Sequence, residues 1–273
     1  MFFSRKQGRT NYSRNVIFKM RYLGSKARIK NEIIPIITKH LNGHNEFIDA
    51  FVGGANLIDS VNYDKKIGLD VSKYSIAIWN KIKDEGTEWI PQAFDDEDYY
   101  DVKNAYKNGD KTFCNAMIGY VGNCLSYGSK WWGGFARFNP KKNEDHVKEA
   151  YNGIKKQHKN FKYLESTEFI NCSYDEYHYK PNSVIYCDPP YQSTIGYESS
   201  FDHEKFWQWC REMSSFGHHV YISEYSAPYD FKCIWRKSVN ETVGKNINQK
   251  VEKLFVYDPK ANMLKINIKH EGI

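Results

Sequence analysis

Metal-binding and redox cysteine motifs are absent from this sequence of 273 residues. Its six cysteines form no C-x-x-C pair, and no histidine cluster completes a spacing that holds zinc. A chain of this length does not need disulfides to fold, so we expect reduced thiols in a cytoplasm. The sequence also lacks any apolar run near the roughly 18 residues that a membrane-spanning helix needs. The first ten residues, MFFSRKQGRT, carry charges where a secretion signal is apolar. We therefore predict no metal centre and no membrane association.

Acidic residues are missing from residues 1–19, whose charged side chains are Arg5, Lys6, Arg9, Arg14 and Lys19. This composition is typical of a flexible N-terminal arm, and contact with nucleic acid is the alternative. The whole chain has a net charge of +6 and a pI of about 8.8. This mild positive charge is compatible with a polyanionic partner but does not establish one.

The order of apolar runs and glycines predicts an α/β domain. Residues 46–82 should form a strand, a glycine turn, a helix, a second strand that ends in an acid, and a second helix. This alternation is typical of a doubly wound parallel sheet. Further strands are predicted at 167–172, at 183–187 and in the run that begins at residue 218. The last run, KVEKLFVY, is expected at an antiparallel edge.

Between residues 84 and 160 the pattern changes, because strand alternation disappears and helices are indicated. This segment also contains SKWWGGFARFNPKKN, a loop rich in glycine, aromatic and basic residues. We therefore predict a mostly helical insertion at 84–160 within an α/β domain formed by residues 20–83 and 161–273.

Two neighbouring strand ends indicate a ligand that contains adenosine. The pair Gly53-Gly54 follows the first strand, where glycine lets a ligand approach the backbone and exposes the N–H groups of the next helix. Asp70 ends the next strand, at the distance from the turn where an acid binds ribose hydroxyls. Alternatively, Asp70 or Ser72 caps the following helix. The dinucleotide fingerprint G-x-G-x-x-G is absent, which argues against NAD or FAD.

The segment SVIYCDPPYQS places Asp188 at the carboxyl edge of the sheet. The carboxylate of Asp188 and the carbonyl of Pro189 can accept two hydrogen bonds from one amino group. Pro189 and Pro190 hold these acceptors still, since each proline fixes its own φ. Tyr191 can stack on a flat heterocycle. The segment thus predicts an aminated base as substrate, and a turn with a capping aspartate is the alternative.

These motifs resemble those of the Dam-like DNA adenine-N6 methyltransferases, the Asp-Pro-Pro-Tyr alpha group, over residues 20–258. RYLGSK is similar to the opening motif, DAFVGGAN to the methionine-binding motif and DPPY to the catalytic motif. EFINCSYDEY resembles the segment near the cofactor's adenine, and NINQKVEKLFVY the late stretch near the target base. Ala55 departs from the family, which often has a further glycine at this position.

The resemblance implies a Rossmann-like methyltransferase sheet with an inserted DNA-recognition domain, and S-adenosyl-L-methionine as the cofactor. It implies that the catalytic residues are Asp188, Pro189, Pro190 and Tyr191. The cofactor-binding residues that it implies are Tyr22, Lys26, Asp49, Phe51, Gly53, Gly54, Asp70, Val71, Ser173, Tyr174 and Asp188.

The resemblance places DNA contacts in the region YVGNCLSYGSKWWGGFARFN, which leads into a short hairpin. Basic and aromatic side chains there suit phosphate contacts and a wedge or groove contact. Alternatively, the two tryptophans pack the inserted helices against the core. The expected DNA-binding residues are Lys130, Trp131, Trp132, Arg137, Asn139, Lys141 and Lys142.

The implied activity is site-specific methylation of adenine N6 in double-stranded DNA, in the cytoplasm of a bacterial or phage-infected cell. The target base must leave the stack to be reached. Methylation of cytosine N4 or of an RNA base is an alternative, and so is an inactive relative that only binds nucleic acid. A nuclease signature is not evident, so we expect a stand-alone enzyme rather than a fused restriction enzyme, from a restriction-modification system or an orphan. A monomer is the default expectation. The recognition sequence cannot be predicted.

Overall fold

The computed structural model describes residues 19–43, 45–140, 144–191, 201–243 and 246–260. Within these residues the strands form a seven-stranded sheet of order β3-β2-β1-β4-β5-β7-β6. The parallel strands are β1 (Phe47–Asp49), β2 (Lys66–Asp70), β3 (Thr167–Asn171), β4 (Val184–Cys187) and β5 (His219–Glu224). Strand β7 (Asn246–Tyr257) pairs antiparallel with β5 and with β6 (Phe231–Val243), so β7 runs against the other strands of this sheet. The predicted doubly wound sheet and its antiparallel edge are confirmed.

Successive strand residues point to opposite faces of the sheet, and both faces are buried. In β1, Phe47 belongs to the core that includes α1 (Lys30–Ile37) and α2 (Lys73–Glu85). Ile48 belongs to the opposite core, against α6 (His203–Ser215). Helices therefore cover the sheet on both sides, and polar groups can gather where the strands end.

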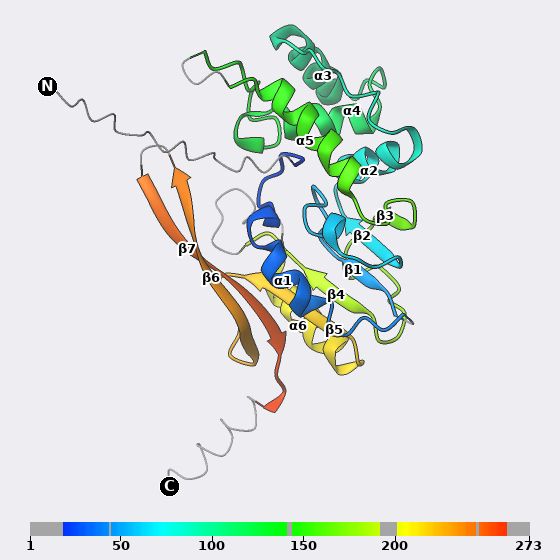
Figure 1. Ribbon diagram of the computed structural model, residues 1–273, viewed down its shortest axis with the longest axis vertical. Helices are drawn as coiled ribbons and strands as arrows, with labels where there is room; N and C mark the ends of the chain where they lie inside the picture. Colours follow the sequence, from blue (N-terminus) through cyan, green and yellow to red (C-terminus); the bar gives the residue numbers. More distant parts are fainter. Residues whose placement is uncertain (1–18, 44, 141–143, 192–200, 244–245, 261–273) are drawn as a thin grey trace, which may run out of the picture.

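The inserted segment is helical, and its helices lie at one end of the molecule (top in Figure 1). They are α3 (Asp96–Asn108), α4 (Asn115–Gly119) and α5 (His146–Asn160), with a π-helical turn at Tyr120–Cys124. Asp95 and Asp98 form a capping box at the start of α3. Tyr99, Tyr120 and Ile154 share one hydrophobic core with Trp79 of α2, so the inserted helices are joined to the sheet by apolar packing.

Strands β6 and β7 form a long hairpin that extends along one side of the molecule (left in Figure 1). They pair with each other from Phe231↔Tyr257 to Val243↔Asn246. Strand β7 pairs with β5 only where Ile222, Ser223 and Glu224 face Phe255, Leu254 and Lys253. Most of the hairpin therefore extends past the end of β5.

The prediction of a helix after the glycine turn is wrong. The segment forms only a short 3₁₀ turn, η2 (Ile58–Ser60). The buried ammonium of Lys66 donates hydrogen bonds to the carbonyls of Ile58 (3.1 Å) and Val61 (3.3 Å). Carbonyls that a longer helix would use are thereby taken up by a side chain, and the chain returns directly into β2.

Candidate active site

A cavity of about 1120 Å³ opens at the carboxyl ends of β1, β2 and β4, where the strand order reverses. Ligands of doubly wound sheets bind at such a point. The structure brings all the predicted catalytic and cofactor-binding residues around this one cavity: Tyr22, Lys26, Asp49, Phe51, Gly53, Gly54, Asp70, Val71, Ser173, Tyr174, Asp188, Pro189, Pro190 and Tyr191. Their individual roles stay predictions.

Asp188 is the first residue after β4, so the strand delivers its carboxylate to the cavity. Lys26, from the 3₁₀ turn η1 (Lys26–Arg28), places its Nζ 2.8 Å from Asp188 Oδ1. Burial raises the pKa of Asp188, whereas the neighbouring Lys26 ammonium lowers it. The sequence predicts Lys26 as a cofactor-binding residue. Its ion pair with Asp188 could not be predicted, because no feature of either segment indicates it.

A second carboxylate, Asp49, ends β1 and is 2 % exposed. Burial raises its pKa well above the usual range, and the charge of Asp188 raises it further. Its Oδ1 has no hydrogen-bond partner among the described residues. A cationic or N–H-bearing ligand group would satisfy this oxygen.

Asp70 connects the glycine turn with helix α2. Its Oδ2 accepts a hydrogen bond from the N–H of Gly53, and its Oδ1 accepts one from the N–H of Ser72, both at 2.8 Å. Ser72 is the cap of α2, because its side chain accepts from the N–H of Ser75. Of the two capping residues considered from the sequence, Ser72 takes that position, and Asp70 remains at the cavity wall.

The glycine pair is required by the ring of Tyr22. A Cβ on Gly53 would lie 2.5 Å from Cε1 of Tyr22, and a Cβ on Gly54 would lie 2.7 Å from its Cβ. The sequence predicts that the two glycines let a ligand approach the backbone. In the structure an aromatic side chain from the opening motif packs directly on the turn, so the turn and Tyr22 form one wall.

Tyr191 is held at its hydroxyl and at its ring. The hydroxyl donates to Glu252 Oε2 at 2.9 Å, from strand β7. The ring centroid lies 4.5 Å from that of Tyr225 at an interplanar angle of 82°, and Lys26 Nζ lies 4.6 Å from the ring centroid of Tyr191. Sequence reasoning expected the late stretch near the base but missed Glu252 and Tyr225. Strand alternation in KVEKLF is the signal that could have indicated Glu252.

The two tryptophans of the predicted recognition loop pack against aromatic rings. Trp131 stacks on Tyr74 with centroids 5.2 Å apart, and it also lines the cavity. Trp132 contacts Tyr99 and Tyr106. The contacts match the packing alternative, although Trp131 keeps 37 % of its surface exposed.

Three further predicted DNA contacts, Lys130, Arg137 and Asn139, do not line the cavity. Lys130 is exposed, and Arg137 pairs with Asp96 at the surface. Asn139 forms a bridge with Glu144, whereas Lys141 and Lys142 fall outside the described residues. Sequence reasoning missed two exposed aromatic residues in this loop, Tyr127 and Phe138, at 71 % and 55 %.

The sheet order, with an antiparallel seventh strand, and the Asp-Pro-Pro-Tyr segment at the reversal point define a Rossmann-like methyltransferase. Residues 22–266 match the family of D12 class N6 adenine-specific DNA methyltransferases, and the chain belongs to this family. The predicted family is therefore confirmed, and membership implies a methyl donor.

Curated relatives are similar at low identity. The type II methyltransferase M.FokI of Planomicrobium okeanokoites is 23 % identical over 202 residues, which are 65 % of this chain and 29 % of that protein. The DNA adenine methylase of Vibrio cholerae is 25 % identical over 179 residues, 59 % of this chain and 62 % of the relative. The modification methylase StsI of Streptococcus sanguinis is 24 % identical over 196 residues, with 65 % and 29 % coverage. The chain thus spans between about a third and two thirds of these relatives.

No described helix has both the length and the apolar character to cross a bilayer. No group of three or more His, Cys, Asp or Glu side chains in the described segments is arranged to hold a metal ion.

Proposed function

We propose that this chain is a site-specific DNA methyltransferase that methylates the N6 amino group of an adenine flipped out of duplex DNA, with S-adenosylmethionine as the methyl donor. One observation carries the proposal. The carboxylate of Asp188 lies at the strand end in the same cavity as the glycine turn and Asp70. Asp188 would therefore accept hydrogen bonds from an amino group beside a wall that would bind a nucleoside, and the chain belongs to a family of adenine-specific methyltransferases.

The side chains that line the cavity support S-adenosylmethionine as the cofactor. Phe51 and Tyr174 stack with centroids 5.4 Å apart and provide an apolar wall for a purine. Asp70 would hold the ribose hydroxyls, and Asp49, with its unsatisfied Oδ1, would receive the ammonium of the methionine part. When bound, S-adenosylmethionine supplies a methyl group on a sulfonium sulfur, and the neutral thioether that remains is a good leaving group.

Asp188 and the carbonyl of Pro189 would accept the two hydrogens of the adenine amino group. This pulls the nitrogen towards sp³ geometry and frees its lone pair, which otherwise is delocalised into the ring. The prolines fix the acceptors, so little reorganisation is needed during the reaction. After the nitrogen has gained its methyl group it must lose one proton, and Asp188 is the carboxylate placed to accept it. The ammonium of Lys26 lowers the pKa of Asp188 against the effect of burial and so favours the ionised form that both tasks need.

Tyr191 would stack on the flipped base. Base flipping costs a few kcal/mol, and stacking on an aromatic side chain returns about 1–3 kcal/mol. The hydrogen bond to Glu252 and the edge contact with Tyr225 fix the ring before the base arrives. A ring held in advance loses less conformational entropy on binding.

We further propose that residues 84–160 form the recognition unit, carried by a core of residues 20–83 and 161–273. Lys130 offers a phosphate contact, and Tyr127 and Phe138 are exposed aromatic residues that could enter a groove. Double-stranded DNA is the proposed partner.

The proposal is tested by incubating the purified protein with methyl-labelled S-adenosylmethionine and unmethylated genomic DNA, followed by separation of the nucleosides. Label recovered in N6-methyladenine is the expected result. Label in N4-methylcytosine would overturn the substrate while keeping the chemistry. An absence of label in DNA, with label in RNA under the same conditions, would overturn DNA as the partner.

A further inference from the structure

The side chain of Gln157, in helix α5, joins three segments of the chain and is 2 % exposed. Its Oε1 accepts a hydrogen bond from the N–H of Met20 at 2.8 Å. Its Nε2 donates to the carbonyls of Gly54 (3.1 Å) and Ala55 (3.2 Å). A helix of the inserted segment therefore holds the glycine turn directly, through one amide.

The turn needs such a restraint because Ala55 has a φ of +52°, in the left-handed region. Residues other than glycine rarely adopt this conformation, and they keep it only where the surroundings enforce it. Ala55 is the position where the related family often has glycine, and its side chain is buried. The amide of Gln157 binds the carbonyl of Ala55 and the one before it, and so fixes both peptide planes.

Helix α5 approaches the opening segment closely enough for this contact. Gly153 lies one turn before Gln157, and a Cβ there would be 2.5 Å from the carbonyl oxygen of Lys19. The carbonyl of Met20 accepts from Asn56 Nδ2 at 3.2 Å, so both polar groups of the Met20 backbone are bound. Tyr22, which packs on the glycine pair, follows two residues later.

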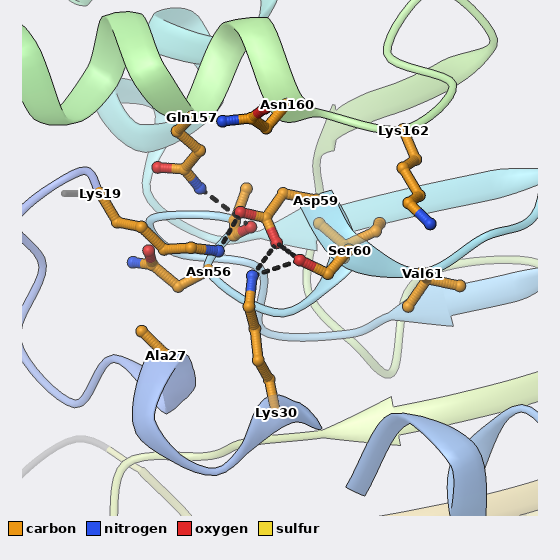
Figure 2. Close-up of polar contacts among 12 residues, drawn as sticks. Lys19, Ala27, Lys30, Asn56, Asp59, Ser60, Val61, Gln157, Asn160 and Lys162 are labelled. Carbon is orange, nitrogen blue, oxygen red and sulfur yellow. Dashed lines mark hydrogen bonds and ion pairs between the residues drawn. The ribbon is translucent and has the colours of Figure 1, made fainter. Parts of the chain in front are cut away.

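Figure 2 shows Gln157 facing the buried carboxylate of Asp59. Lys19 and Lys30 pair with this carboxylate, the latter at 2.6 Å. Burial raises the pKa of Asp59, and Lys30 opposes that shift. The ion pairs fix the carboxylate of Asp59 next to the amide of Gln157. Gln157 therefore lies between this ion-paired cluster and the turn to which it is hydrogen-bonded.

We propose that Gln157 is a positioning residue that keeps the turn Val52–Asn56 in the conformation that binds the cofactor. The hydrogen bonds from its amide supply the restraint that lets an alanine adopt a positive φ at position 55. The cofactor's identity rests on the proposed function. Gln157 is not among the residues that line the cavity, where the proposed reacting groups lie. Its loss should therefore change cofactor affinity much more than the chemical step.

The test is the dissociation constant of S-adenosylhomocysteine, measured by calorimetry on the full chain with Gln157→Ala. We expect binding to weaken at least tenfold, while kcat at saturating cofactor changes less than threefold. Adding Ala55→Gly to Gln157→Ala should restore most of the affinity, because glycine adopts a positive φ without a restraint. Asn152→Ala, an exposed amide of the same helix, is the matched control and should bind as wild type.

Gln157→Glu is the second variant, in case the alanine variant does not fold. It keeps an acceptor for the N–H of Met20 but has no donor for the two carbonyls. A folded Gln157→Glu or Gln157→Ala variant that binds S-adenosylhomocysteine like the wild type would overturn the inference alone, provided the wild type binds and methylates DNA. Absence of binding by the wild type would overturn the proposed function as well. A merely structural role would lower the active fraction without rescue by Ala55→Gly.

Discussion

At the scale of single residues, opposing influences act on the pKa of Asp188. Burial raises its pKa, the Lys26 ammonium lowers it, and the carboxylate of Glu252 raises it again. The ionised form is needed to accept hydrogens from an amino group. The neighbours of Asp188 should therefore fix the acid limb of the activity profile.

Lys26→Met should shift the acid limb of the kcat profile to higher pH. Removal of the ammonium removes an influence that lowers the pKa of Asp188, so the carboxylate ionises only at higher pH. A shift of about one pH unit or more is expected from a cation at this distance. Initial rates between pH 5 and 9 measure it, and Lys81→Met, which changes a half-buried lysine paired with Glu85, serves as control. An unmoved limb would show that Lys26 does not control Asp188.

Local motifs were predictable at this scale and partnerships were not. Asp188 was found because two prolines and a tyrosine follow it directly. The pairing of Lys26 with Asp188, or of Gln157 with Gly54, joins residues more than 100 positions apart. No feature of a single segment indicates such a contact.

At the scale of elements, the β6–β7 hairpin brings a carboxylate to the active site from the far end of the sequence. Its strand β7 carries Glu252, which binds the Tyr191 hydroxyl. The sequence predicts only the last run, KVEKLFVY, at an antiparallel edge. The contribution of the hairpin to the site depends on its extension past the end of β5, which strand patterns do not report.

Glu252→Gln should shift the acid limb in the direction opposite to Lys26→Met. The variant keeps an acceptor for the Tyr191 hydroxyl but removes a negative charge that raises the pKa of Asp188. The limb should therefore move to lower pH, with a KM for DNA close to wild type. Glu252→Ala should also raise the KM for DNA severalfold, because the ring is no longer fixed. A limb that moves to higher pH in the glutamine variant would contradict this explanation.

The inserted loop should separate a packing residue from a surface residue. Trp131→Ala removes a ring packed on Tyr74 and over Gly122, and should lower the free energy of unfolding by about 2 kcal/mol, below the range for fully buried rings. Tyr127→Ala, at an exposed position, should leave stability unchanged and weaken DNA binding. Urea titrations and fluorescence anisotropy with a DNA duplex check the pair. Equal losses of stability would refute the distinction.

At the scale of the whole molecule, one apolar core runs from the sheet into the inserted helices, and a buried lysine lies within it. Burial lowers the pKa of Lys66 to about 7, although the charge of Asp59 opposes this shift. The native state thus binds fewer protons than the unfolded chain between about pH 7 and the ordinary lysine pKa near 10.4.

Lys66 should make the protein more stable as pH rises through this window. The unfolded state holds the extra proton there, so the slope from this one group is positive, up to about 1.4 kcal/mol per pH unit. The unfolding free energy of the wild type minus that of Lys66→Met should therefore rise from pH 7 to pH 10. Lys65→Met, which changes a neighbouring lysine bound to the Gly43 carbonyl, is the control. A constant difference would contradict a neutral buried Lys66.

The sheet could be predicted from the sequence because strands and glycine turns alternate locally. The short turn at Ile58–Ser60 could not, since a lysine from the next strand takes up its carbonyls. The site was predictable wherever residues follow a strand end. The packing of Tyr22 on the glycine turn and the hydrogen bonds from Gln157 to that turn were not, because they depend on the packing of distant segments.

The most direct measurement is single-turnover methyl transfer from labelled S-adenosylmethionine to DNA by the wild type, Asp188→Asn and Asp188→Ala, with cofactor binding measured on the same preparations. The account predicts N6-methyladenine formation by the wild type, a strongly reduced rate in the asparagine variant and no transfer by the alanine variant. All three should still bind S-adenosylhomocysteine. Wild-type transfer by Asp188→Ala would contradict the central claim that this carboxylate receives the amino group.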